Sequence, residues 1–216
     1  ERKEGQRPMS RSSNLLIDQL PEEIIVNGIG YPINTDFRIG IMFDQMLCDS
    51  KLTDEEKVTL ALQMYFKESI PEDIDSALPE LLAFYRCGSS MPPKPRKPED
   101  GSSPRSPARV LDYDYDAPLI YAAFLSQYGI DLQDIVALHW WKFSAMLKGL
   151  NSNEEISKIM SYRAVDLSSI KNKEERKRYA TLKAKYALPN DDVIAEKKAL
   201  AEALFGTKEA STNENS

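Results

Sequence analysis

Histidine is the side chain best suited to acid–base chemistry near neutral pH, and the sequence contains one. His139 lies within the apolar run Leu138-His139-Trp140-Trp141 of a chain of 216 residues. A serine or cysteine nucleophile would need this histidine as its base, together with an orienting carboxylate. No nucleophile motif accompanies it. We therefore interpret His139 as a core or hydrogen-bonded structural residue and predict that the protein is not an enzyme.

The sequence offers weak patterns for metal or phosphate binding. The two cysteines, Cys48 and Cys87, match no metal-ligand spacing and are typical of small buried hydrophobes in a reducing compartment. The segment Asp112-Tyr113-Asp114-Tyr115-Asp116 lacks the glycine and glutamate of a calcium-binding loop. These residues are better suited to N-cap oxygens and first-turn charge for a following helix. Gly28-Ile29-Gly30 lacks the remaining glycine of a dinucleotide-binding loop and the helix after it. We predict neither cofactor nor metal.

A basic stretch near the C-terminus raises the possibility of nucleic-acid binding. Seven basic residues lie between residues 171 and 186: Lys171, Lys173, Arg176, Lys177, Arg178, Lys183 and Lys185. Tyr179, Leu182 and Tyr186 recur at helical intervals, which indicates a helix with one packed stripe and one solvated face. The chain carries 34 acidic and 28 basic residues, a net charge of −6. Because this charge repels phosphate backbones on average, we favour a solvated face and do not expect nucleic acid as a partner.

Length and composition indicate one domain with tails. Apolar residues make up 42% of the chain, enough to bury one sizeable core. No uninterrupted apolar stretch approaches the roughly 18 residues that a membrane span requires, and residues 1–13 lack the apolar segment of a secretory signal. We expect no membrane partner and a location in the cytoplasm where the protein is made. Met9 is a candidate start, which would make residues 1–8 an appended or read-through segment.

Composition along the chain divides it into zones. Residues 1–13 are polar and predicted to be disordered, and residues 14–88 are patterned as a hairpin plus N-terminal helices. Residues 89–110 hold six prolines among serine, lysine and arginine and are predicted to form a flexible linker or loop. Residues 111–188 are patterned as C-terminal helices of the same domain. Residues 189–216 are predicted to form an additional helix and a disordered tail.

The first patterned zone opens with a strong hairpin signal. Asn27-Gly28 separates two apolar runs, and a type I′ turn needs positive φ at both of its central residues. Asn34 or Thr35 is expected to cap a helix that follows and runs to about Cys48. The core face of this helix is expected to carry Ile39, Met42, Phe43, Met46 and Leu47.

Two further helices are expected before the proline-rich zone. Thr53 and Glu56 have capping-box spacing ahead of the first of them. The second is expected to run from about Pro71 to Arg86, with proline in its first turn. Pro79 lies inside this helix and should kink or split it.

The second patterned zone has helical periodicity throughout. Asp116 is expected to cap a helix that Gly129 ends, and the next helix is expected to run from about Leu132 to Leu150. Helices over residues 154–163, 172–187 and 191–205 complete the pattern. Because strands do not alternate with helices, the predicted fold class is mainly α, a helical bundle with a small N-terminal β-hairpin.

The predicted helix over residues 132–150 is the most apolar element. Two stripes together wrap far more than the ~100° arc of a one-sided surface helix. They are Leu132, Val136, Trp140, Phe143, Leu147 and Leu150 in one, and Ile135, Leu138, His139, Trp141, Ala145 and Met146 in the other. Such a helix is either central in the bundle or buries its second stripe against another protein. The candidate protein-binding residues are Trp140, Trp141, Phe143, His139, Tyr121, Phe124 and Tyr128.

Several blocks resemble the bacteriophage "gene product fifteen" family. The most specific are Tyr121-Ala122-Ala123-Phe124, Tyr128-Gly129-Ile130-Asp131-Leu132 and Leu138-His139-Trp140-Trp141-Lys142-Phe143, which occur in this order. Asn34-Thr35-Asp36-Phe37-Arg38 is similar to that family's entry into its first helix, and Tyr162-Arg163-Ala164-Val165-Asp166-Leu167-Ser168 to its C-terminal part. The resemblance extends over about residues 22–188.

This resemblance implies a protein of tailed phages and prophages of Gram-positive bacteria, encoded between the tail-tube and tape-measure genes. It implies a tail morphogenesis factor in the host bacterial cytoplasm, a tail-assembly chaperone that binds the tape-measure protein, the tail-tube protein or both. The alternatives are a minor structural tail protein retained in the virion and a nucleic-acid-binding regulator. A homo-oligomer is left open, and the family brings no catalytic residue.

Overall fold

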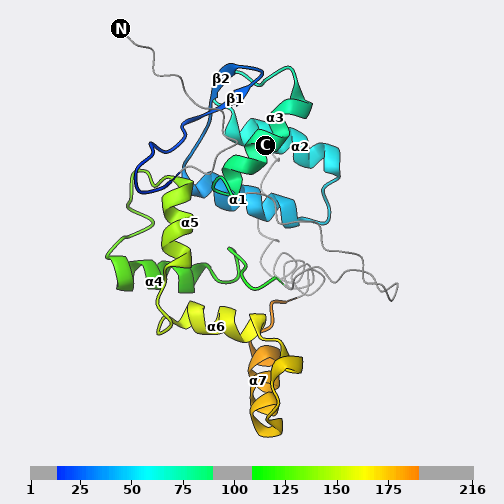
Figure 1. Ribbon diagram of the computed structural model, residues 1–216, viewed down its shortest axis with the longest axis vertical. Helices are drawn as coiled ribbons and strands as arrows, with labels where there is room; N and C mark the ends of the chain where they lie inside the picture. Colours follow the sequence, from blue (N-terminus) through cyan, green and yellow to red (C-terminus); the bar gives the residue numbers. More distant parts are fainter. Residues whose placement is uncertain (1–13, 90–108, 190–216) are drawn as a thin grey trace, which may run out of the picture. The chain divides into compact units, whose positions relative to one another are not determined.

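The computed structural model describes residues 14–89 and 109–189 (Figure 1). They divide into two compact units. Among the described residues, the first unit comprises 14–89 and 116–157, and the second unit comprises 109–115 and 158–189. Residues 116–157 therefore group with the N-terminal helices. The predicted N-terminal tail, most of the predicted linker and the predicted helix over 191–205 lie outside the described residues.

The described residues confirm the predicted fold class, a mainly helical protein with a small two-stranded antiparallel hairpin. The strands are β1 (Glu23–Val26) and β2 (Ile29–Pro32). The helices are α1 (Phe37–Cys48), α2 (Asp54–Tyr65), α3 (Ile74–Tyr85), α4 (Ala117–Tyr128), α5 (Trp140–Lys148), α6 (Glu155–Ala164) and α7 (Lys173–Lys185), with a short 3-10 helix η1 (Leu167–Ser169) before α7. None of the described helices is long and apolar enough to cross a membrane.

The hairpin forms as predicted. Asn27 and Gly28 have φ of 53° and 82°, the positive values that a type I′ turn requires, and Val26 pairs with Ile29 across it. The side chains of Ile24 and Val26 are buried, and β1 packs against α3. This packing supplies the apolar support that an isolated two-stranded ribbon lacks in water.

Helix α1 begins one or two residues later than expected. Asp36, rather than Asn34 or Thr35, is the N-cap, and its carboxylate accepts a hydrogen bond from the Arg38 backbone N–H. The Asn34 side chain instead accepts from the Asp36 N–H. The predicted core face is partly wrong because Met42 and Leu47 are exposed. The buried residues of α1 are Phe37, Gly40, Phe43 and Met46.

The start of α2 agrees with the sequence prediction, and the start of α3 differs from it. Thr53 and Glu56 form the predicted capping box. Helix α3 starts at Ile74 rather than at Pro71, because the Asp73 carboxylate accepts the Ser76 N–H and caps it. Pro79 does not split α3, which continues to Tyr85. The chain leaves α3 through Cys87, whose φ of 56° is left-handed.

The predicted long helix over residues 132–150 is wrong. Residues 131–139 form turns and irregular structure, and only Trp140–Lys148 are helical as α5. Helix α4 does end at Gly129, which is left-handed with φ of 65°. Asp116 stands at the N-cap position of α4, but its side chain makes no capping hydrogen bond there. The Asp112 carboxylate accepts from the Asp114 and Tyr115 N–H groups and shapes the preceding turn.

The second unit has few buried side chains. Asn172 is the N-cap of α7, and its side chain accepts from the Glu174 and Glu175 N–H groups. Helix α7 buries none of its residues. Tyr162 of α6 stacks on Tyr186 with ring centroids 5.8 Å apart. The stripe predicted along α7 therefore packs only partly, and its basic face is solvated.

Candidate functional site

His139 is the N-cap of α5 rather than a mid-helix residue. Its Nδ1 accepts the Trp141 backbone N–H at 3.1 Å, so the ring proton belongs on Nε2, which lies 3.1 Å from the Pro21 carbonyl oxygen and donates to it. Burial is the largest effect and lowers the pKa of His139; the hydrogen bond to Pro21 opposes it, and the charge of Lys142 lowers the pKa further. Both ring nitrogens are thus used by backbone groups, and the neutral form is favoured.

The paired tryptophans hold the end of α3. The Trp140 Nε1–H donates to the Tyr85 carbonyl at 2.7 Å, and the Trp141 Nε1–H donates to the Phe84 carbonyl at 2.8 Å. Carbonyls in the last turn of a helix have no partner within that helix. The indoles supply such partners, although the Phe84 carbonyl also accepts the Cys87 N–H, and the Trp-Trp pair thus joins α5 to α3.

A glycine in α1 makes room for one of these indoles. A Cβ atom built on Gly40 would lie 2.1 Å from Cε3 of Trp140, far inside van der Waals contact. Trp140 also stacks on Tyr85, with ring centroids 5.4 Å apart. Glycine at position 40 therefore allows α1 and α5 to pack closely. Any larger residue would force the Trp140 ring or the α1 backbone to move.

The candidate protein-binding residues lie mostly in the core of the first unit. Trp140 and Trp141 are 4% and 3% exposed, and Phe124 and Phe143 are fully buried. Phe143 stacks between Phe37 and Phe124, with centroid distances of 4.9 and 5.1 Å. Of the two positions expected for this apolar stretch, these four residues take the one in the core of the first unit. The helix is shorter than its apolar pattern suggested.

The remaining candidates, Tyr121 and Tyr128, are only partly exposed and make structural hydrogen bonds. The Tyr121 hydroxyl donates to Asp131 at 2.8 Å, and this bond raises the pKa of Tyr121. The Tyr128 hydroxyl donates to the Met146 carbonyl at 2.9 Å. Each hydroxyl holds a segment that flanks α5 in place, so neither tyrosine is a candidate for a catalytic role.

Arg38 and Asp36 organise the segment before α5, a role that their place in the block of residues 34–38 did not indicate. The Arg38 guanidinium donates to the carbonyls of Leu132 and Ile135, at 3.2 and 2.9 Å. Residues 35–37 pair with 138–140: Trp140 N–H donates to Thr35 and Phe37 N–H to Leu138. These contacts take up backbone groups that a helix over 132–138 would need.

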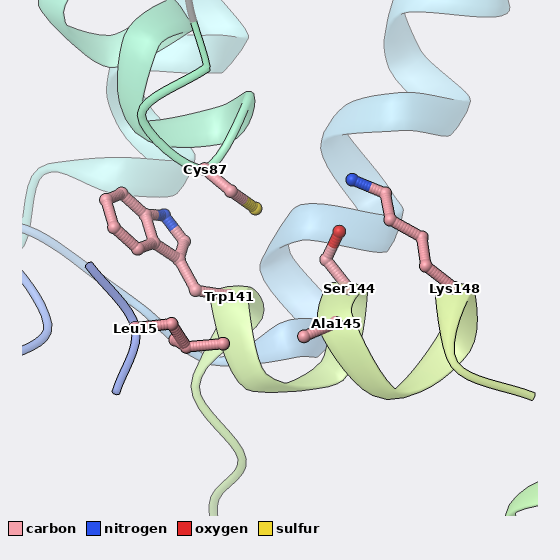
Figure 2. A pocket seen from close by; sticks show the side chains of 6 residues that line it. All are labelled: Leu15, Cys87, Trp141, Ser144, Ala145 and Lys148. Atoms are coloured by element: carbon pink, nitrogen blue, oxygen red, sulfur yellow. The ribbon is translucent and has the colours of Figure 1, made fainter. Parts of the chain in front are cut away.

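The first unit has a small hollow beside the indole of Trp141 (Figure 2). Its volume is about 160 Å³, and its lining is Leu15, Cys87, Trp141, Ser144, Ala145 and Lys148. Burial raises the pKa of Cys87, so its thiol is a poor nucleophile there. Leu16 and Ile17 follow Leu15 in the chain, and their side chains are 90% and 80% exposed.

Comparison with known proteins decides the family. The family model described as "Bacteriophage Gp15 protein" matches residues 16–188. The chain belongs to this family. No curated protein matches the chain, and no solved structure matches it.

Membership in the Gp15 family confirms the resemblance drawn from the aromatic blocks. In this Gp15 protein the residues of those blocks form the contacts between α3, α4 and α5. The block of residues 34–38 adds backbone hydrogen bonds to the start of α5. The residues of these blocks pack in the core and make hydrogen bonds to backbone groups. The exposed apolar residues at the rim of the hollow lie at the N-terminal edge of the matched region.

Proposed function

We propose that this Gp15-family protein is a phage tail morphogenesis factor, a tail-assembly chaperone that binds the tape-measure protein, the tail-tube protein or both in the bacterial cytoplasm. Membership in a bacteriophage family supports a phage role. The observation that carries the binding role is the exposed apolar segment Leu15–Ile17 beside the hollow at Trp141.

Exposed apolar side chains in sequence are uncommon on a soluble protein without a partner. Leu16 and Ile17 are almost fully accessible, whereas Leu15 lines the hollow with Trp141 and Ala145 (Figure 2). A partner could place one apolar side chain in the hollow and cover the two exposed residues beside it. Lys148 at the same rim favours a partner that carries a carboxylate next to its apolar residue.

The geometry around His139 favours a structural role for this residue over a catalytic one. Its two ring nitrogens bond the Trp141 N–H and the Pro21 carbonyl, so the side chain holds the start of α5 in place. The Cys87 thiol beside the hollow has a raised pKa, which disfavours the thiolate that nucleophilic catalysis needs.

Co-expression with the tape-measure protein or the tail-tube protein encoded beside it tests the proposal. We expect the protein to keep the tape-measure protein soluble and to be recovered with it in a pull-down. The double variant Leu16→Glu/Ile17→Glu should lower recovery at least about tenfold, because it places charge on the apolar contact.

Val136→Glu provides the matched control, because Val136 is 96% exposed and lies in a different segment. This variant should bind like the unmodified protein. Equal loss in both variants, or full binding by the Leu16→Glu/Ile17→Glu variant, would remove this surface from the proposal. Abundant copies in purified virions would contradict a chaperone that leaves the particle and favour a structural tail protein.

A further inference from the structure

The two units carry opposite charge. In the sequence, residues 14–89 and 116–157 of the first unit contain 19 acidic and 7 basic residues, whereas residues 109–115 and 158–189 of the second unit contain 5 acidic and 10 basic residues. We propose that the protein self-associates, with α7 of one copy bound to an acidic surface on the first unit of a second copy.

The acidic surface lies at the end of the hairpin. The Asn27 side chain donates to the Asp73 carboxylate at 2.8 Å, which ties the hairpin turn to the start of α3. Three exposed isoleucines are close in sequence to these two residues: Ile29 on β2 follows the hairpin turn, and Ile70 and Ile74 lie on either side of Asp73 in the chain. Exposed carboxylates of Glu68, Glu72 and Asp75 alternate with them along the chain. We call these six residues the hairpin-end surface.

The carboxylates of the hairpin-end surface are available to a partner. Within residues 14–89 and 109–189, no ion pair joins Glu68, Glu72 or Asp75 to a basic side chain. Apolar side chains bordered by charge are typical of surfaces that bind another protein. The complementary surface needs positive charge on long, partly apolar side chains.

Helix α7 provides such side chains. Its exposed basic residues, with Lys171 just before it, are Lys171, Lys173, Arg176, Lys177, Arg178 and Lys185. None of these six forms an ion pair with a carboxylate in the described part of the chain. Lys173 and Lys177 lie on the side of α7 away from the half-buried Tyr179 and Leu182. That side of the helix therefore faces solvent.

A second copy fits α7 better than a nucleic acid does. Lysine and arginine stems can cover exposed isoleucines while their charged groups reach the carboxylates. A polyanion would bind the basic groups but leave Ile29, Ile70 and Ile74 uncovered. It would also be repelled by the acidic excess of the first unit, the same charge that attracts α7 of another copy.

Sedimentation velocity of the full chain over a range of concentrations tests self-association. At low ionic strength the sedimentation coefficient should rise with concentration, and high salt should abolish the rise because exposed charges are screened. Lys173→Glu/Lys177→Glu should weaken association at least about tenfold, and Glu68→Lys/Glu72→Lys should do the same.

The mixture of these two variants is the decisive sample. Each variant repels itself, but mixing them restores opposite charges at both contacts, so association should return. Restored association also shows that both variants are folded. The control Lys51→Glu/Lys142→Glu changes the net charge equally on exposed residues of the first unit and should still associate.

Three results would overturn the proposal. The first is a concentration-independent monomer at low ionic strength, whether because no contact forms or because it forms within one chain. The second is a mixture of the two variants that stays monomeric. The third is salt-sensitive retention of duplex DNA by a monomeric protein that Lys173→Glu/Lys177→Glu abolishes, which would assign α7 to a polyanion.

Discussion

The two units are held together by different interactions. The first unit buries stacked aromatic rings from α1, α3, α4 and α5, in which each ring contacts others. In the described part of the second unit, the buried residues are Asp112, Ile159 and Arg163, two of them charged. The stability of the first unit therefore depends on the close fit of its aromatic rings. The stability of the second unit depends on polar contacts to a few backbone groups.

The two units also differ in the charge and the exposed apolar residues of their surfaces. The acidic first unit has apolar residues exposed at the hollow and at the hairpin end, whereas the basic second unit presents a solvated helix. A closely packed core holds the residues around it in fixed positions, so the first unit can present binding surfaces. A lightly packed helix can open at lower cost. Substitutions should thus have large, global effects in the first unit and small, local effects in the second.

Gly40→Ala should have the largest effect. The added methyl would meet the Trp140 ring at 2.1 Å, and neither the ring nor the α1 backbone can give way easily. We expect a loss of about 3 kcal/mol or more of unfolding free energy by urea denaturation, although alanine is ordinarily the better helix former. In a Trp140→Leu background the same substitution should cost much less. An equal cost in both backgrounds would show that the two residues do not clash.

Arg163→Met should have a smaller and more local effect. The Arg163 guanidinium donates to the carbonyls of Tyr186 and Val110, at 2.6 and 3.1 Å, and lies over the Tyr115 ring. Methionine fills similar space without these donors, so we expect a loss of about 2 kcal/mol. Hydrogen exchange should accelerate in α7 and stay unchanged in α1 and α5. The exposed Arg178→Met is the control, and equal acceleration in both units would contradict a local effect.

Thr53→Ala tests a local contribution within the first unit. The Thr53 hydroxyl oxygen accepts the Glu56 N–H at 3.2 Å, and the Glu56 carboxylate accepts the Thr53 N–H at 2.8 Å. Removing the hydroxyl should cost about 1 kcal/mol, measured by thermal unfolding. Thr53→Ser should restore most of it. No change in Thr53→Ala would mean that the box adds nothing to the stability of α2.

Much of the fold could be predicted because its signals are local. Asn27-Gly28 determines a turn through its own backbone preferences, Thr53 and Glu56 are three residues apart, and Gly129 ends α4 by adopting positive φ. Each signal requires only near neighbours. The hairpin, the start of α2 and the end of α4 therefore follow from the sequence.

The segment before α5 could not be predicted in this way. Apolar residues recur at helical spacing from Leu132 onward, but Arg38 binds the carbonyls of Leu132 and Ile135 from more than 90 residues away. His139 then serves as an N-cap, a role that serine, threonine, aspartate and asparagine more often fill. Long-range contacts override the periodicity, and Val136 becomes almost fully exposed. The same contacts place the tryptophans in the core, one of the two positions expected for this apolar stretch.

The smallest effect that we predict is the pH dependence of this N-cap. Because the pKa of His139 is lowered in the folded protein, mainly by burial, the unfolded chain binds the proton more tightly. Its contribution to stability is present above the unfolded pKa of about 6.5 and is lost as the pH falls toward the folded pKa. Protonation of Nδ1 would also remove the acceptor that caps Trp141.

His139→Asn isolates this contribution, because asparagine is a good N-cap that does not titrate in this range. The unmodified protein should lose melting temperature from neutral pH toward pH of about 5.5, above the range in which ordinary carboxylates titrate. The His139→Asn variant should show a flatter profile over the same interval. As His139 is the one histidine in the sequence, no second imidazole can produce the difference. Parallel profiles would mean that the imidazole keeps its ordinary pKa and that the start of α5 does not depend on its neutral form.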